Sequence, residues 1–213
     1  MNLNVHEIFA TVQGEGYDTG LPCIFVRLYG CNVKCSYCDQ PQCPKTDAHR
    51  MSIDKVMDSI RKYRCKYVCI TGGEPLIQPS IFILIYELIA NGFKVSIETN
   101  GTIPLEDDDH RKFKYVMDVK CPSSGVTTSN CYNNLKVLHM SDEVKFVVAD
   151  RADYEFMKRI LNKYPTKAKI LVSPVFDYNN KQSIAKDLVE WLLEDHLFDV
   201  KLQLQIHKFI DVK

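Results

Sequence analysis

Three cysteines lie close together in the sequence, at Cys31, Cys35 and Cys38, in a C-x3-C-x2-C pattern. Thiolates with this spacing can converge on one point and hold a metal centre. Cys43 is the nearest candidate for a fourth ligand. If Cys43 joins them, the site is a closed structural site for zinc or an all-cysteine cluster. If it does not, three cysteines hold a 4Fe–4S cluster with one iron open to a substrate or cofactor.

Two later segments are rich in glycine and in polar groups that bind ligands, namely Thr71-Gly72-Gly73-Glu74-Pro75 and Glu98-Thr99-Asn100-Gly101. Adjacent glycines let a backbone come close to a ligand, and their amide and carbonyl groups can bind the amino group of an amino acid. The carboxylate of Glu98 and the amide of Asn100 can hydrogen-bond a ribose. Each segment alone is also compatible with a simple glycine-centred turn.

The elements that must position these residues alternate along the chain. Short apolar runs predict strands, and apolar residues at helical spacing predict helices after the N-cap Ser52, from Pro79-Ser80 to Asn91-Gly92, and over Asp153–Asn162 and Ser183–Glu194. The charged segment Glu106–Lys114 is predicted to be a solvated surface loop. The predicted strands are Cys23–Leu28, Tyr67–Ile70, Lys94–Ile97, Tyr115–Val119, Glu143–Val148, Lys169–Val172 and Lys201–Gln205.

Alternating strands and helices indicate βαβ units with a parallel sheet and right-handed crossovers. About seven strands in 213 residues fall short of a complete eight-fold barrel, which needs roughly 250 residues. We therefore expect an α/β fold with one domain over residues 1–213, an incomplete (β/α) TIM-like barrel. Its site should lie at the carboxyl ends of the strands, where the cysteines and both glycine segments fall.

The composition restricts the class of protein further. Lys and Arg number 27, Asp and Glu number 27, and this balance argues against nucleic-acid binding by bulk charge. The sequence has neither a membrane-length apolar run nor the features of a signal peptide, so we expect a cytoplasmic protein with no membrane partner. Clustered cysteines in that compartment are typical of metal or redox chemistry. The unclustered ones are predicted to be ordinary, and Cys69 to be a small buried apolar residue.

The C-x3-C-x2-C pattern after the first predicted strand resembles the signature of the radical S-adenosylmethionine superfamily. Tyr37 fits the aromatic residue usual before the third cysteine, and the Gly-Gly-Glu-Pro segment follows in the expected order. The resemblance implies a barrel of the radical SAM type with a 4Fe–4S cluster on Cys31, Cys35 and Cys38. It also implies S-adenosylmethionine on the open iron as the source of a 5′-deoxyadenosyl radical.

A narrower resemblance spans nearly the whole chain. Glu7-Ile8-Phe9, Val12–Gly16, Phe25–Arg27, Gly30–Asn32 and Gln205–Phe209 resemble the 7-carboxy-7-deazaguanine synthase family. The resemblance implies a lyase that converts 6-carboxy-5,6,7,8-tetrahydropterin to 7-carboxy-7-deazaguanine with loss of ammonia, in queuosine and deazaguanine biosynthesis. It further implies Mg²⁺, a homodimer, and an electron donor such as flavodoxin or ferredoxin.

The resemblance also assigns residues to the pterin. Arg27 offers a planar fork that matches the substrate carboxylate, and the Gln13 and Glu15 side chains can read its pyrimidinone edge. In the family the terminal segment folds over the site, which would place Lys213 there. The predicted substrate residues are Val12, Gln13, Gly14, Glu15, Arg27, Thr71, His207 and Lys213.

The expected S-adenosylmethionine pocket departs from the family pattern at three places. Gln40 replaces a threonine that ligates Mg²⁺, Asp118-Val119-Lys120 replaces Ser-Pro-Lys, and Ser173 replaces a glutamine. An amide oxygen is still acceptable to Mg²⁺, so Gln40 is the predicted metal ligand, with Asp39 as an alternative. The predicted cofactor residues are Tyr37, Cys38, Asp39, Gly72, Gly73, Glu74, Glu98, Asn100, Asp118, Val119, Lys120 and Ser173.

Two other functions are compatible with part of the pattern. A glycyl-radical-activating enzyme would share the cysteines and the glycine turn but would act on a protein partner. The Val12–Gly16 segment and Arg27 argue against it. A structural metal or electron-transfer module would have no substrate, and iron and sulfide analysis distinguishes it from a zinc protein.

Overall fold

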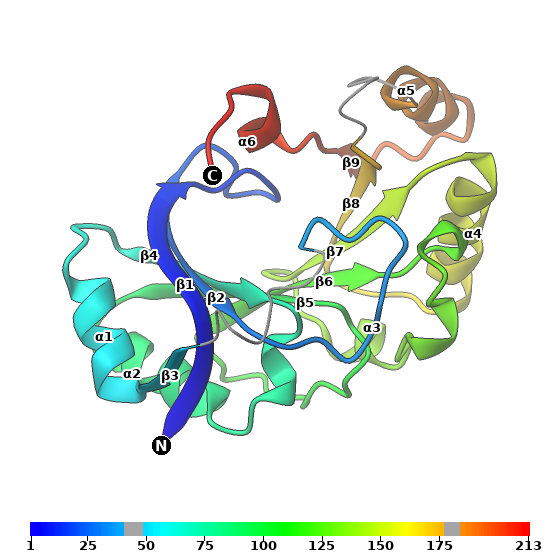
Figure 1. Ribbon diagram of the computed structural model, residues 1–213. Coiled ribbons are helices and arrows are strands. Elements are labelled where there is room, and N and C mark those ends of the chain that lie inside the picture. Colours follow the sequence, from blue (N-terminus) through cyan, green and yellow to red (C-terminus); the bar gives the residue numbers. More distant parts are fainter. Residues whose placement is uncertain (41–48, 177–183) are drawn as a thin grey trace.

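The computed structural model describes residues 1–40, 49–176 and 184–213, so Cys43 lies outside the described residues. One sheet of nine strands forms a strongly curved wall with helices on its outer side (Figure 1). The strand order is β3-β1-β2-β4-β5-β6-β7-β8-β9. The strands are β1 (Asn2–Val12), β2 (Pro22–Leu28), β3 (His49–Ser52), β4 (Tyr67–Gly72), β5 (Lys94–Thr99), β6 (Phe113–Val119), β7 (Glu143–Val148), β8 (Lys169–Pro174) and β9 (Val200–Leu202).

Strands β2 and β4 to β9 pair in parallel, whereas β1 pairs antiparallel with both β2 and β3. Among the described residues, the edge strands β3 and β9 do not pair with each other, so the barrel stays open. The predicted incomplete (β/α) barrel is therefore confirmed. The sequence analysis missed β1 and β3. In β1 a register shift between Val5 and Glu7 breaks the two-residue alternation that would have identified it.

Six α-helices are described, and the long ones cover the convex face (Figure 1). They are α1 (Ile53–Arg61), α2 (Ile81–Ala90), α3 (Asn134–Val137), α4 (Arg151–Lys163), α5 (Ala185–Glu194) and α6 (Ile206–Phe209). Short 3₁₀ turns occur at Pro75–Ile77, Pro122–Ser124 and Thr127–Ser129. Ser52 caps α1 as predicted, since its side chain accepts a hydrogen bond from the backbone N–H of Lys55. Helix α4 begins two residues earlier than predicted because Asp150 is its cap.

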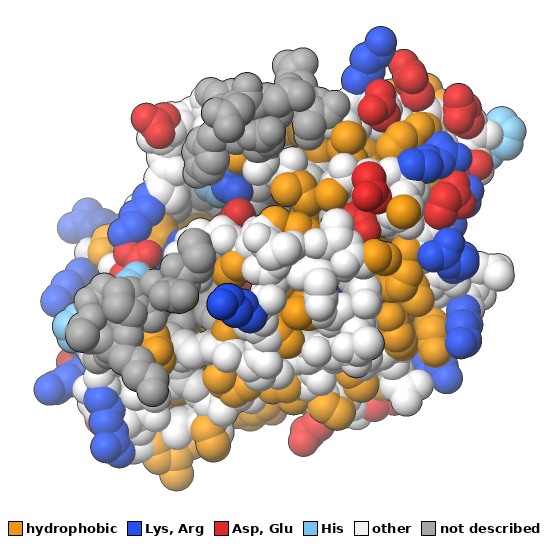
Figure 2. Space-filling view, turned by 45° about the vertical axis from the view of Figure 1, so that its right-hand side comes forward, with side chains coloured by type: hydrophobic (Ala, Val, Ile, Leu, Met, Phe, Trp, Pro, Cys, Tyr) orange, Lys and Arg blue, Asp and Glu red, His pale blue; other side chains and the backbone are white. Residues whose placement is uncertain are grey.

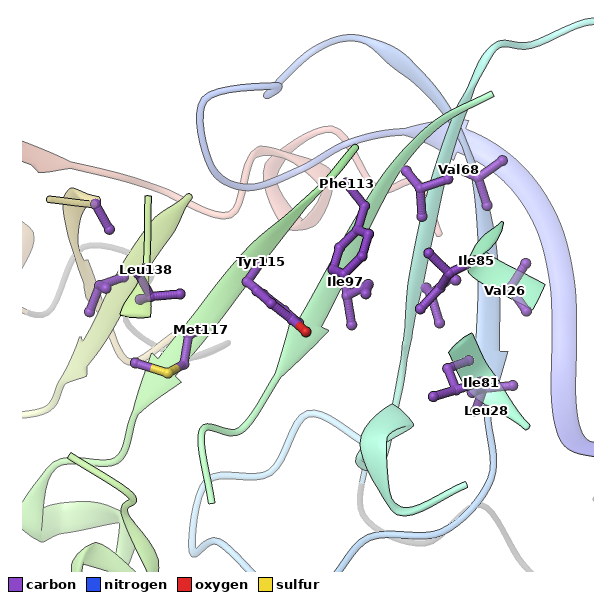
Figure 3. Packing of buried hydrophobic residues seen from close by; sticks show 14 of the residues in the cluster. Val26, Leu28, Val68, Ile81, Ile85, Ile97, Phe113, Tyr115, Met117 and Leu138 are labelled. Carbon is purple, nitrogen blue, oxygen red and sulfur yellow. The ribbon is translucent and has the colours of Figure 1, made fainter. Parts of the chain in front are cut away.

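The main core lies between the convex face of the sheet and these helices. Alternate strand residues such as Val26, Leu28, Val68, Ile97 and Met117 point into it, together with Ile81 and Ile85 of α2 (Figure 3). Period-two alternation places the intervening residues on the concave face. Parallel strands are usually apolar on both faces, so the polar residues of the concave face indicate a site.

The predicted bounds of one loop and one strand need correction. Phe113 and Lys114 belong to β6, and the Arg111 side chain is only 2% exposed because its guanidinium pairs with the buried Asp142. The segment is solvated only in part. The last strand ends at Leu202 and not at Gln205, because the chain leaves the sheet edge and the Ile206 N–H donates to the carbonyl of Gly14 at 3.1 Å.

Charged side chains of both signs are interspersed on the face in Figure 2, in keeping with the neutral composition. None of the helices in the described ranges has the length and apolar character needed to cross a bilayer.

Candidate functional site

A cavity of about 270 Å³ opens on the concave face, at the carboxyl ends of the strands. Residues from five adjacent strands line it on the same alternating face: Phe25 and Arg27 of β2, Thr71 of β4, Glu98 of β5, Val116 and Asp118 of β6, and Lys145 and Val147 of β7. The loop after β1 and the C-terminal segment close the opposite side. These two segments lie side by side at the top of Figure 1.

The cysteine loop follows β2 and contributes Cys31, Cys35 and Cys38 to this cavity. Ser36 anchors it, since its backbone N–H donates to the Ser124 carbonyl at 3.0 Å and its hydroxyl to the Ser123 carbonyl. Ser123 is held in turn by two hydrogen bonds to the buried Asp153. Burial raises the pKa of the Cys35 thiol, and the Lys120 ammonium opposes that shift. Lys120 therefore favours the thiolate that a metal ligand must be.

The glycine pair after β4 packs against the start of the cysteine loop. A Cβ atom on Gly72 would lie 2.1 Å from the Leu28 carbonyl oxygen, and one on Gly73 would lie 2.0 Å from that of Gly30. The Glu74 N–H also donates to the Gly30 carbonyl at 2.8 Å. The two glycines line the cavity and hold the chain that leads into Cys31.

Two of the predicted cofactor residues, Glu74 and Val119, do not line the cavity, and their contact with the cofactor stays a prediction. Glu74 is fully buried beneath it and accepts hydrogen bonds from Thr99 and from the N–H groups of Leu76 and Asn100. Burial raises its pKa, and the N–H donors of Leu76 and Asn100 oppose the shift. Glu74 thus ties two strand ends together. Val119 faces the core because it alternates with Asp118.

Glu98 sits at the centre of a hydrogen-bonded group on the wall of the cavity. One carboxylate oxygen accepts from the Thr71 hydroxyl at 2.7 Å, and the other from the Gln13 amide at 3.3 Å. The Cys69 thiol, buried as predicted, also donates to Glu98 at 3.3 Å. Gln13 and Thr71, which are predicted to bind the pterin, therefore contact Glu98, which is predicted to bind the ribose of the cofactor.

A second group consists of alternating charges. The Lys145 ammonium contacts Glu15 and lies 3.2 Å from Oδ1 of Asp118, and Lys120 lies 2.9 Å from Oδ2 of Asp118. Burial acts to raise the pKa of both carboxyl groups, but these ammonium groups, with the Gln205 amide at Glu15, hold each pKa below its ordinary value. Both acids are therefore ionised at neutral pH.

Arg27 lies on the cavity wall beside an acid and an aromatic ring. Its Nε is 3.2 Å from Glu7, and its guanidinium carbon is 5.4 Å from the centre of the Phe9 ring. Lys213 also contacts Glu7 and lies over Phe9. Lys213 therefore lines the cavity together with Arg27.

The remaining predicted residues meet at the mouth of the cavity. His207 packs against Gly14, and burial lowers the pKa of its imidazole. Asp39 accepts from Lys208 at 2.8 Å and from Gln205 at 3.1 Å, with Gln40 beside it on the lining. Val12, Tyr37, Asn100 and Ser173 also line the cavity.

Sequence reasoning missed several residues that line the cavity. Phe9, Phe25, Val33, Val116, Lys145, Val147, Val175, Phe176 and Gln205 are among them. A lysine inside an apolar strand was the available signal for Lys145, because alternation with Val144 and Phe146 assigns it to the concave face.

Residues 25–167 match the Radical SAM superfamily. A 7-carboxy-7-deazaguanine synthase from Methanospirillum hungatei JF-1 is 41% identical over 209 residues, which cover 98% of this chain and 85% of that relative. The chain belongs to the 7-carboxy-7-deazaguanine synthase family. The crystal structure of QueE from Escherichia coli superposes with a TM-score of 0.73 and 26% identity, covering 96% of this chain and 94% of that chain. Streptococcus suis SuiB bound to S-adenosylmethionine, with a TM-score of 0.58, 13% identity and coverage of 82% and 48%, is similar in fold alone.

Membership of this radical SAM family implies a 4Fe–4S cluster and S-adenosylmethionine, and the thiols fit a cluster. Among the described residues, three ligand atoms lie within 4.8 Å of one another only at Asp107, Asp109 and His139. The cysteine thiols are therefore too widely spaced, as they stand, for one zinc ion, whose thiolates sit ~2.3 Å from the metal. A cluster binds each thiolate at a separate iron and needs the wider spacing.

Proposed function

We propose that this chain converts 6-carboxy-5,6,7,8-tetrahydropterin to 7-carboxy-7-deazaguanine with release of ammonia. The observation that carries the proposal is that one cavity is lined by the three cysteines, by Arg27 and by the carboxylates of Glu15, Glu98 and Asp118. The chain is also 41% identical to a 7-carboxy-7-deazaguanine synthase. The substrate is flat and anionic, with donors along its pyrimidinone edge. A single half-buried arginine and two ionised or hydrogen-bonded carboxylates complement such a molecule.

The cluster and S-adenosylmethionine, when bound, supply a 5′-deoxyadenosyl radical that removes a hydrogen atom from the substrate. Cys31, Cys35 and Cys38 would hold the cluster, which would leave its fourth iron for S-adenosylmethionine. Gly72 and Gly73 would present backbone groups to the methionine moiety of the cofactor. Glu98, Asn100 and Asp118 would bind its ribose. Tyr37, Cys38, Asp39, Lys120 and Ser173 would complete the pocket.

The substrate would lie between β2 and the C-terminal segment. Arg27 would bind its carboxylate bidentately, with Lys213 as a second contact. Gln13, Glu15 and Thr71 would face the pyrimidinone edge, supported by the backbone of Val12 and Gly14. His207, which burial keeps neutral, can donate one hydrogen bond and accept another there.

We extend the proposal to Mg²⁺, bound by the side-chain oxygen of Gln40 at the mouth of the cavity. Gln40 is exposed and lines the cavity beside Asp39, and oxygen ligands of this kind suit a hard cation. Residues 1–213 would form one domain and assemble as a homodimer. A flavodoxin or a ferredoxin would supply the electron that radical SAM enzymes require.

Anaerobic turnover tests the function. Reduced, cluster-loaded protein is given S-adenosylmethionine and 6-carboxytetrahydropterin, and the product mass is followed. We expect the deazapurine at that mass and one equivalent of ammonia. Accumulation of 5′-deoxyadenosine without the deazapurine would refute the substrate and keep the radical SAM assignment. Adding and removing Mg²⁺ in the same assay, with a Gln40→Ala variant, tests the metal.

A further inference from the structure

Lys145 has no role in the substrate and cofactor assignments made above, yet it lies at their boundary. It is in the middle of β7, on the concave face, and its side chain is 11% exposed. The β6–β7 register pairs Asp118 directly with Lys145. The Lys145 ammonium contacts Glu15 from the loop after β1 and lies 3.2 Å from Asp118.

Among the described residues, Lys145 is the cation that pairs with both of these acids, since Lys120 pairs with Asp118 alone. Glu15 also accepts hydrogen bonds from the side-chain amide of Gln205 and from that of Gln203, the latter at 3.4 Å. Amide donors do not neutralise a carboxylate. Without Lys145, Glu15 would be a largely enclosed carboxylate facing a second carboxylate, an arrangement that desolvation and like charge both disfavour.

Burial acts to lower the pKa of Lys145, but Asp118 and Glu15 raise it well above its ordinary value, so the ammonium is permanently charged at neutral pH. A permanently charged group is suited to fixing its neighbours and is not suited to proton transfer. The three-way contact also fixes the distance between Glu15, predicted for the pterin, and Asp118, predicted for the cofactor ribose.

We propose that Lys145 is a positioning residue that keeps Glu15 ionised and aimed as the acceptor for the donor-rich edge of the substrate, in register with Asp118. The inference rests on the proposed function and adds a specificity determinant to it. A neutral Glu15 would present a proton where the substrate presents its own donors.

The test measures equilibrium binding of 6-carboxytetrahydropterin and of S-adenosylmethionine to cluster-loaded protein. Lys145→Met should weaken pterin binding by about tenfold to hundredfold, the effect of losing a charged hydrogen bond, and weaken cofactor binding less, because Lys120 still pairs with Asp118. Lys145→Arg should restore most of the affinity. Lys145→Gln provides a second uncharged variant if Lys145→Met does not fold.

A double-mutant cycle with Glu15→Gln tests whether Lys145 affects pterin binding through Glu15. If Lys145 acts through Glu15, the double variant binds the pterin no more weakly than either single variant. Additive losses would mean that Lys145 contacts the substrate itself, and would overturn the positioning role. Unchanged pterin binding in Lys145→Met would overturn it also, as would a loss confined to S-adenosylmethionine.

Lys114→Met is the matched control. Lys114 of β6 lies on the same face of the sheet as Lys145. It pairs with the buried Glu143 and with Asp18, but it does not line the cavity. Its loss should lower the thermal midpoint and leave pterin affinity unchanged. Wild-type protein that binds S-adenosylmethionine but not the pterin would overturn the proposed function and this inference together. Binding by wild type and Lys145→Met alike overturns the inference alone.

Discussion

A Cβ atom placed on Gly14 would lie 1.8 Å from Nδ1 of His207. The backbone carbonyl of Gly14 also accepts a hydrogen bond from the Ile206 N–H at 3.1 Å. The loop after β1 and the C-terminal segment therefore meet without space for a methyl group between them. Because both segments line the cavity, this contact shapes the substrate side of the site.

The first prediction is that Gly14→Ala displaces the C-terminal segment. The new methyl group must push His207 away, so we expect the pterin affinity to fall about twofold to tenfold, as for loss of one neutral hydrogen bond. The cluster should be retained, because the cysteine loop follows β2 and is anchored by the hydrogen bonds of Ser36 to Ser123 and Ser124. Calorimetric binding and iron content measure the two effects separately. Gly92→Ala, where a Cβ meets nothing within 4 Å, is the control for a glycine replacement, and its strained positive φ should lower stability alone.

Arg27→Ala should weaken substrate binding by roughly 1.5–3 kcal/mol, because a charged hydrogen bond to the substrate carboxylate is lost. Glu7, its present partner, keeps its contact with Lys213. Arg27→Lys should recover only part of the loss, since an ammonium cannot bind a carboxylate bidentately. Arg61→Ala, at an exposed arginine, is the control and should leave substrate binding unchanged. Unchanged apparent affinity in Arg27→Ala would remove Arg27 from the carboxylate role.

The sequence was sufficient for the architecture because strand periodicity and motif order are local signals. All seven predicted strands exist, and Cys31, Gly73 and Asn100 come to one cavity because each follows a parallel strand at its carboxyl end. That convergence follows from topology alone. Strand β1 was missed because its bulge interrupts the alternation, and β3 because four residues carry too little pattern.

The side-chain partners were harder to predict because they depend on contacts between distant parts of the chain. Glu74 belongs to a motif that suggests ligand binding, but its carboxylate turns inward to satisfy the N–H groups of Leu76 and Asn100. Lys145 joins Glu15 across 130 positions of sequence. Periodicity can assign Lys145 to a face of the sheet, but only the fold identifies which acids it meets there.

The cysteines give a third prediction. Cys31→Ala, Cys35→Ala and Cys38→Ala should each abolish the cluster, because each removes one of three ligands. Cys65→Ala, at a cysteine that does not line the cavity, should retain it. Iron and acid-labile sulfide analysis after anaerobic reconstitution measures this. Cys43 lies outside the described residues, and the Cys43→Ala variant should also retain the cluster. Loss of the cluster in that variant would mean a closed site with four cysteine ligands.

A fourth prediction concerns Asn100, whose amide nitrogen lies 3.7 Å from Sγ of Cys31 and donates to the Asn32 side chain at 2.9 Å. A donor to a ligating sulfur withdraws electron density and favours the reduced cluster. Asn100→Ala should therefore shift the cluster midpoint potential to a more negative value. Redox titration followed by electron paramagnetic resonance measures it, without substrate or S-adenosylmethionine. Asn91→Ala, at the end of α2, is the remote control, and an unchanged or raised potential in Asn100→Ala contradicts the assignment.

The last prediction is a pH dependence of stability that belongs to His207. Burial lowers the pKa of His207 in the folded chain; the Glu15 carboxylate opposes that shift, and the Lys208 ammonium adds to it. In the unfolded chain the imidazole takes up its proton near its ordinary pKa of about 6.5. Between the two pKa values the unfolded state binds more protons, so stability falls as pH falls.

The stabilising contribution is thus fully present above about pH 6.5 and is lost as pH falls through the lower pKa of the folded state. Urea unfolding of the wild type and of His207→Gln at about pH 7.5, 6.5 and 5.5 gives the comparison. The wild-type advantage in unfolding free energy should shrink towards low pH, because the glutamine does not titrate. An advantage that stays constant or grows on acidification would mean that the folded chain does not favour the neutral imidazole, and that His207 is not held in the buried contact with Gly14.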